Sequence, residues 1–256
     1  SPLLIPIVHE VVPSPLLLTL GASNPTDDAS ITEGGGLMEM LDLRAQSRQH
    51  MPLIDASEQL RKAAIGTWRA RMVNEHGSAR VFEGLAVQLE EVGISEEDLT
   101  RLRSFADEER SHGVLCGSVV EALGGKAIAP ALDIIPFPRH EEVGPLEAAL
   151  RNLLSISCLS ETVAVSLIGA ERLEMPEGPL KEVLTRIYAE ECGHSNFGWR
   201  LLETLLDMGD EDLRRRLGEY LVVAFAHLEQ HELRHLPINA KVPPGGAALG
   251  LCSGLD

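Results

Sequence analysis

The chain has few of the residues that mark several common classes of protein. Its 256 residues include four cysteines, which lie far apart in the sequence and form no CxxC pair. This spacing argues against a zinc ribbon, a rubredoxin-type iron site and a disulfide scaffold. Aromatic residues make up only 4% of the chain, whereas Leu, Ala and Glu are abundant, and this balance favours helices.

Positive charge is also scarce. The formal net charge is −17, which disfavours a nucleic-acid backbone or an anionic membrane as a partner. No apolar run reaches the ~20 residues that a membrane-spanning helix needs. No Lys or Arg precedes Arg44, so residues 1–20 lack the positive start of a signal peptide. We therefore expect a cytoplasmic protein that binds neither nucleic acid nor membranes.

Proline and glycine divide the chain into an irregular start, a helical body and a tail. Residues 1–54 hold five prolines within their first 25 positions and a run of three glycines at 34–36, which predicts a partly irregular extension. Residues 55–235 show the apolar periodicity of helices. Residues 236–256 form a tail rich in glycine and proline, and nothing in the sequence indicates a sheet.

Five helices are predicted in the body. Capping residues, prolines and glycines place them at 55–92, 95–123, 145–175, 179–209 and 210–235. The first begins at Asp55, whose spacing to Glu58 fits a capping box. Short turns join the first two helices and the next two, and residues 126–144 form one long connection. The pattern predicts an all-α fold: a four-helix bundle with one long crossover and a fifth C-terminal helix.

Charged residues interrupt the apolar faces of three of these helices. Glu109 with His112, Glu161, and Glu191 with His194 lie near the middle of their helices, on the side that should face the core. A buried carboxylate without a partner is costly, so a positive group must face these residues. Each Glu-x-x-His pair also places a carboxylate and an imidazole one turn apart on one helix face.

A further acidic ligand is expected from the helix at 55–92, where Glu75 and Glu83 are the candidates. Glu75 lies on the apolar face, whereas Glu83 is turned about 80° away at ~100° per residue. The spacing from Glu75 to the first Glu-x-x-His motif also resembles that from Glu161 to the second. We therefore predict a metal site built from six residues: Glu75, Glu109, His112, Glu161, Glu191 and His194.

The donor types narrow the choice of metal. Carboxylate oxygen with imidazole nitrogen suits iron or manganese, and the lack of closely spaced cysteines weakens the case for zinc. A helical bundle in which the buried Glu and His residues only form hydrogen bonds to one another is the alternative without a metal.

Two segments resemble the paired metal-binding motifs of the ferritin-like superfamily. They are residues 106–112, with the sequence ADEERSH, and residues 189–194, with the sequence AEECGH. The resemblance covers about residues 60–206 and is specific at the six predicted ligands. It implies two iron ions, bridged by carboxylates, that react with dioxygen or peroxide. Manganese or a mixed iron–manganese pair fits the same donors.

Members of this superfamily differ in their reactions, so the resemblance does not name one. Ile187 stands where arylamine oxygenases carry an extra histidine, and no CxxC pair supplies the rubredoxin-like module usual in rubrerythrins. The negative charge disfavours the tRNA hydroxylase, and the long extensions disfavour iron storage in a cage. We expect a di-iron oxidoreductase, working as a monomer or homodimer, that uses dioxygen to oxidise a small organic substrate. A ferroxidase or iron-binding protein without an organic substrate is the alternative.

Tyr188 and the run from His231 to His235 each have a functional and a simpler structural interpretation. Tyr188 lies three residues before Glu191 and is a candidate redox-active neighbour of the metals, although such a tyrosine more often packs in the core. The run from His231 to His235 matches the HExxH motif of zinc proteases. It stands just before Pro237, with no third ligand downstream and no sheet to hold a substrate. A solvated helix end is therefore the favoured interpretation.

Overall fold

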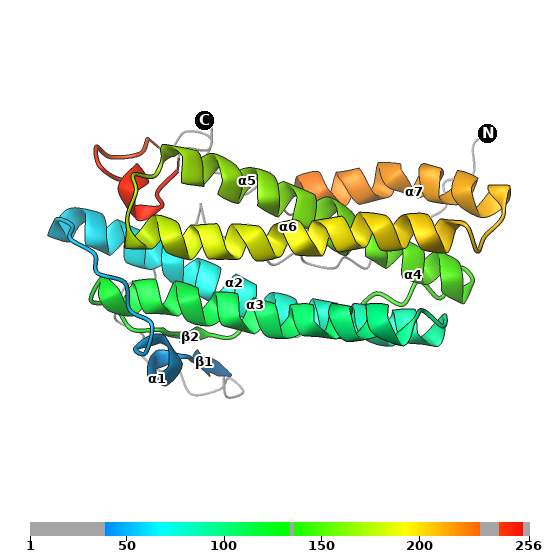
Figure 1. The fold of residues 1–256 in the computed structure, drawn as a ribbon, viewed down its shortest axis with the longest axis horizontal. Helices are drawn as coiled ribbons and strands as arrows, with labels where there is room; N and C mark the ends of the chain where they lie inside the picture. Colours follow the sequence, from blue (N-terminus) through cyan, green and yellow to red (C-terminus); the bar gives the residue numbers. More distant parts are fainter. Residues whose placement is uncertain (1–38, 134–135, 231–240, 253–256) are drawn as a thin grey trace, which may run out of the picture.

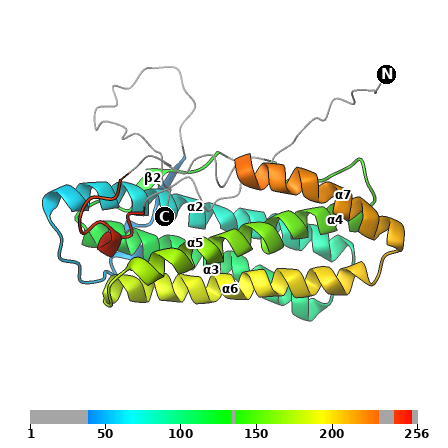
Figure 2. The same cartoon turned by 90° about the horizontal axis from the view of Figure 1, so that it is seen from above.

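The protein is described by a computed structural model that covers residues 39–133, 136–230 and 241–252. Long helices lie side by side along one axis (Figures 1 and 2). The long helical segments are α2 (Glu58–Glu91), α3 (Glu96–Ala122), α6 (Pro179–Leu206), and a continuous run made of α4 (Pro145–Leu153), the π-helix η1 (Leu154–Ser160) and α5 (Glu161–Glu174). The prediction of a mainly helical, all-α protein is confirmed.

Side-chain caps set where the helices begin. The Ser57 hydroxyl accepts a hydrogen bond from the Leu60 N–H at 3.5 Å, so α2 starts at Glu58, and the capping box predicted at Asp55 is wrong. Asp210 caps α7 (Glu211–Leu228), which contacts α4 at one end of the molecule (Figure 2). The predicted HExxH motif at 231–235 lies outside the described residues.

The connection from α3 to α4 runs along the bundle (Figure 1). It packs against α2 at glycines, because a Cβ at Gly77 would lie 2.7 Å from the Leu132 side chain and one at Gly84 would lie 2.5 Å from Phe137. Within this connection, β2 (Ile128–Pro130) pairs antiparallel with β1 (Met40–Asp42). We predicted no sheet, and that prediction is wrong. Three-residue strands are too short to show a period-two pattern.

Residues 39–54, the described part of the predicted N-terminal extension, pack on the bundle. After β1, the short helix α1 (Arg44–Ser47) buries Ser47 completely. Arg48 then forms an ion pair with Glu121 of α3 at 2.7 Å. These contacts tie the start of the described chain to the last turn of α3.

The buried apolar side chains form two clusters. One contains Phe82, Phe105 and Phe197, and the other contains Trp68 and Met72. On α2, α3 and α6 the change from one cluster to the other occurs at buried glutamates. The bundle therefore has a polar layer between two apolar layers.

The run from Pro145 to Glu174 is the one helical stretch among the described residues that is long and apolar enough to cross a membrane by length and composition. Half of its most apolar window is buried inside the protein. A core helix of a soluble protein passes the same test, because its apolar residues face other helices. The sequence predicted no apolar run long enough to span a membrane, and the absence of a membrane partner stays a prediction.

Candidate metal centre

Four glutamates and two histidines meet in the polar layer of the bundle. None of the six is more than 4% exposed. They come from four helical segments and are the residues predicted from the sequence: Glu75 of α2, Glu109 and His112 of α3, Glu161 of α5, and Glu191 and His194 of α6. The rejected candidate, Glu83, is half-exposed and pairs with Arg110 at the surface instead.

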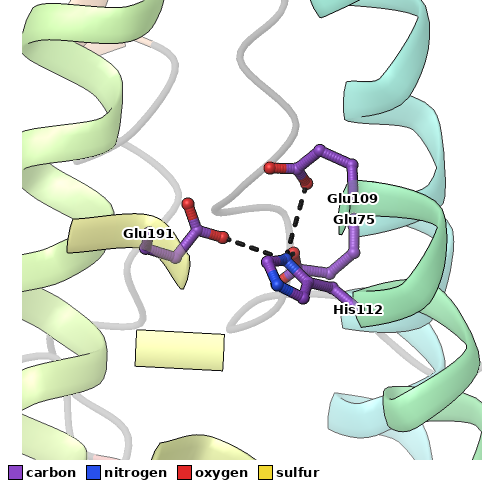
Figure 3. A group of neighbouring side chains, drawn as sticks. All are labelled: Glu75, Glu109, His112 and Glu191. Atoms are coloured by element: carbon purple, nitrogen blue, oxygen red, sulfur yellow. Dashed lines mark ion pairs between the residues drawn. The ribbon is translucent and has the colours of Figure 1, made fainter. Parts of the chain in front are cut away.

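The six side chains form two groups of four that share Glu109 and Glu191. One group adds Glu75 and His112, and within it the candidate ligand atoms lie within 4.8 Å of one another. Figure 3 shows this group, with carboxylates from α2 and α6 directed at the imidazole of His112. The second group adds Glu161 and His194 and meets the same distance limit. Each group could hold a metal ion, and the shared carboxylates belong to both.

Both imidazoles turn Nδ1 toward the carboxylates. His112 Nδ1 lies 3.2 Å from Glu191 Oε1 and 3.4 Å from Glu75 Oε2. His194 Nδ1 lies 3.1 Å from Glu191 Oε2 and 3.2 Å from Glu109 Oε1. The two rings are 6.0 Å apart, centre to centre. Each histidine thus presents the same nitrogen to the middle of the cluster.

The cluster contains more acceptors than its own donors can satisfy. Six buried oxygen and nitrogen atoms in it have no hydrogen-bond partner among the described residues: Glu75 Oε2, both oxygens of Glu109, His112 Nδ1, Glu161 Oε2 and Glu191 Oε1. Buried polar atoms are normally paired, and buried carboxylates need a positive partner. Carboxylate and imidazole donors suit Fe or Mn, so these residues fit a metal centre.

The outer nitrogen of each histidine contacts a carboxylate that the sequence analysis did not assign. Glu190 of α6 lies 2.7 Å from Nε2 of His112 on α3, and Glu108 of α3 lies 2.9 Å from Nε2 of His194 on α6. A glutamate on α3 therefore orients the histidine on α6, and a glutamate on α6 orients the histidine on α3. A carboxylate at Nε2 keeps the proton there and leaves Nδ1 free to bind a cation. The sequence carries this signal, since both motifs read Glu-Glu-x-x-His.

Replacing Glu190 with Ala should weaken metal binding in the group that contains His112. Loss of such an orienting carboxylate costs roughly 10–100-fold in metal affinity, because the imidazole is no longer held with Nδ1 inward. Competition titration with a chromogenic chelator measures the change. Glu203→Ala, at an exposed position on the same helix, is the matched control and should bind metal as the parent does. Equal affinities for the two variants would contradict the orienting role.

Without a cation, the cluster retains protons. Burial, reinforced by the charge of Glu191, raises the pKa of Glu109 to about 8 and the pKa of Glu161 well above its usual range. Burial opposes protonation of His112 and His194, but the nearby carboxylates, led by Glu190 at His112 and Glu108 at His194, outweigh it and raise both pKa values well above their usual range. Protons therefore supply the positive charge that the buried carboxylates require.

Metal binding should weaken as the pH falls, because cations must displace these protons. Between pH 8 and pH 6, the single proton on Glu109, with its pKa of about 8, lowers the apparent affinity roughly 50-fold. The two imidazoles act in the same direction. Calorimetric titration with Mn²⁺ in buffers of different ionisation enthalpy measures both the affinity and the protons released. A pH-independent affinity with no proton release would show that the metal binds elsewhere.

The helical run that contains Glu161 changes from π-helix to α-helix at this residue. The predicted single helix at 145–175 contains the π-helix η1, which ends at Ser160, and such insertions are frequent at functional sites. The Ser157 hydroxyl donates to the carbonyl of His194 at 3.1 Å. A Cβ at Gly198 would lie 2.5 Å from the Ser157 carbonyl oxygen. The π-helix therefore packs closely on α6 beside the second group of candidate ligands, which contains Glu161 and His194.

Tyr188 lies away from the contacts that define the cluster. Its ring packs against Gly169, where a Cβ would lie 3.1 Å from Cε2. The Arg172 guanidinium lies 4.6 Å from the ring centre. Both partners belong to α5, beyond Glu161. A redox role for Tyr188 stays a prediction, and none of these contacts adds support to it.

Comparisons with protein-family models, curated proteins and solved structures found no match to this chain.

Proposed function

We propose that this chain is a ferritin-like di-iron carboxylate protein that uses dioxygen to oxidise a small organic substrate. One observation carries the proposal: two buried groups of metal-capable donors share Glu109 and Glu191. A glutamate from each of two helices and a Glu-x-x-His pair from each of two others is the ligand set of ferritin-like dinuclear centres. Shared carboxylates between two such groups favour bridged ions over two independent sites.

Charge balance supports two divalent ions. Four ionised glutamates would bring four negative charges into this buried layer, and two divalent cations would neutralise them while both histidines stay neutral. A single divalent ion would leave two buried negative charges, which is costly without further pairing. The same count fits iron, manganese or one of each.

The protein's residues hold and shield such a centre. Bound iron ions would supply the redox and Lewis-acid chemistry. Glu108 and Glu190 fix the histidine rings from outside. Phe105 packs on His194 with the ring centres 4.2 Å apart. The centre of the Phe82 ring lies 5.3 Å from that of the same histidine. These aromatic rings place apolar surface against His194 of the second group.

Anaerobic loading with Fe²⁺, followed by dioxygen, tests the proposal. We expect about two iron ions per chain and dioxygen uptake that only the loaded protein shows. Uptake that continues with an organic substrate and a reductant supports the oxidase. Iron oxidation that stops after one turnover, in a large closed assembly, supports the ferroxidase alternative. Less than one iron per chain, or no uptake, would mean that the redox assignment is wrong.

A further inference from the structure

Arg101 of α3 contacts two of the side chains that touch the ring of His194. Its Nη1 donates a hydrogen bond to Oε1 of Glu108 at 2.7 Å, and Oε2 of the same carboxylate lies 2.9 Å from His194 Nε2. The Arg101 guanidinium also lies 4.5 Å from the centre of the Phe105 ring. That ring in turn packs on His194 with the two ring centres 4.2 Å apart. Each of the four side chains therefore contacts two of the others.

The spacing along α3 brings these groups together. Arg101 precedes Phe105 by four residues and Glu108 by seven, so the three side chains lie on one side of the helix. The helix that carries His194, α6, contacts α3 (Figure 1). Gly193 of α6 faces Arg101, and a Cβ there would lie 3.4 Å from Nη2. The guanidinium therefore reaches across to α6 beside the histidine whose neighbours it contacts.

His112, which belongs to the first group of candidate ligands together with Glu75, has less support from outside. Glu190 lies 2.7 Å from its Nε2, but the contact from Nε of Arg186 to Oε1 of Glu190 is 3.3 Å long. Among the described residues, no phenylalanine, tyrosine or tryptophan ring packs on His112, and the ring next to it is that of His194, 6.0 Å away centre to centre. The outer contacts of the two histidines therefore differ.

This difference should affect metal binding, because a ligand that is already fixed loses less side-chain entropy when an ion binds. Glu109 and Glu191 belong to both groups, so they cannot distinguish the two. His194 Nδ1 lies 3.2 Å and 3.1 Å from oxygens of these shared glutamates. Glu108 restricts rotation of the imidazole in this position, and Phe105 restricts its tilt.

We propose that Arg101 is a positioning residue: it fixes the two side chains that hold His194, and so gives the second group of candidate ligands the higher affinity for a divalent cation. A first ion then binds in the second group, and the group with His112 fills after it. The inference rests on the proposed function, because it concerns the metal centre of that function. It adds an order of filling and a residue outside the six candidate ligands.

The sign of the effect distinguishes positioning from charge. Arg101 is positive, so loss of its charge alone would reduce the repulsion of a bound cation and strengthen metal binding. Loss of positioning would instead weaken metal binding, and only in the second group. The ion pair of Arg101 with Glu108 is partly exposed, at 46% and 23% of the two side chains, so its loss should change the stability of the fold little. A weaker affinity would therefore not reflect unfolding.

Each group is measured alone in a chain that lacks the other. Glu75→Ala leaves the second group and Glu161→Ala leaves the first, and binding of Mn²⁺ to metal-free protein is followed by the EPR signal of the free ion. We expect the second group to bind Mn²⁺ at least about threefold more tightly than the first. Adding Arg101→Ala should weaken binding to the second group by about threefold to tenfold, less than the loss of a direct partner of the histidine, and leave the first group unchanged.

The chain with all six candidate ligands provides a second measurement if either of these variants folds poorly. Mn²⁺ should bind to it in two steps, and Arg101→Ala should weaken only the first step. Arg101→Lys keeps the charge and can still reach Glu108, so it should recover most of the lost affinity.

Arg103→Ala is the matched control. The Arg103 side chain lies on the same helix, is 52% exposed and pairs at 2.8 Å with Glu90, an exposed carboxylate of α2. Its loss should change neither affinity. Equal losses in the two arginine variants, or unchanged or tighter binding to the second group in Arg101→Ala, would overturn the positioning role.

Failure of the positioning role and failure of the proposed function give different results. If both groups bind Mn²⁺ and Arg101→Ala alters neither affinity, the dinuclear centre stands and only the positioning role fails. If the chain with all six candidate ligands binds Mn²⁺ in neither group, the metal centre is wrong, and the proposed function fails together with the inference.

Discussion

Replacing Glu191 with Ala is expected to remove metal from both halves of the centre. Its two carboxylate oxygens lie 3.2 Å from Nδ1 of His112 and 3.1 Å from Nδ1 of His194, so it belongs to both groups of donors. We predict that metal content falls from about two ions per chain to nearly none. Equilibrium dialysis followed by elemental analysis measures it.

Two other glutamates supply the comparison for Glu191. Glu75 belongs to one group only, so Glu75→Ala should retain about one ion per chain. Glu83, two turns further along α2, is half-exposed at the surface, so Glu83→Ala should retain both ions. If Glu75→Ala loses as much metal as Glu191→Ala, the ions are not bound in the two groups described.

Adding one methyl group at Gly198 should strongly destabilise the protein. A Cβ there would lie 2.5 Å from the carbonyl oxygen of Ser157 and 2.7 Å from its hydroxyl, and the carbonyl belongs to a backbone that cannot rotate away. Overpacking of this kind costs about 2 kcal/mol, which corresponds to a fall in Tm of roughly 4–8 °C for a chain of this size. Differential scanning calorimetry of the metal-free protein measures it.

Gly218 of α7 is the control for this substitution. A Cβ at that helical position meets no atom within 4 Å, so Gly218→Ala should gain about 0.5–1 kcal/mol from the smaller backbone entropy of Ala. The two variants are therefore expected to change stability in opposite directions. Metal binding in the group that contains Glu161 should weaken only in Gly198→Ala, because only there must the π-helix shift.

The buried positions of the clustered glutamates and histidines could be predicted because the residues on the buried face of a helix recur at a regular spacing. Apolar residues every three to four positions define one face, and a glutamate on that face stands out because an unpaired charge there is costly. The same rotation of about 100° per residue separates Glu75 from Glu83. The geometry of a regular helix was enough to choose between them.

Features that depart from regular geometry could not be predicted in the same way. The π-helix before Glu161 packs against Gly198 of α6, which is far from it in the sequence, and no local motif marks it. The pairing of Leu41 with Ala129 depends on contacts between segments far apart in the chain. The first helix is capped by Ser57 rather than by the predicted Asp55. Tertiary contacts are involved in the first two cases, whereas the cap is a local contact between Ser57 and Leu60.

Each helical hairpin supplies a carboxylate that orients a histidine of the other hairpin. The hairpin at 58–122 supplies Glu108 to His194, and the one at 145–206 supplies Glu190 to His112. Neither hairpin alone contains either complete group of candidate donors, so cation uptake would be thermodynamically linked to docking of the hairpins. A chelator should therefore loosen the whole bundle, and a chain cleaved within its crossing connection should reassemble more readily with metal than without it.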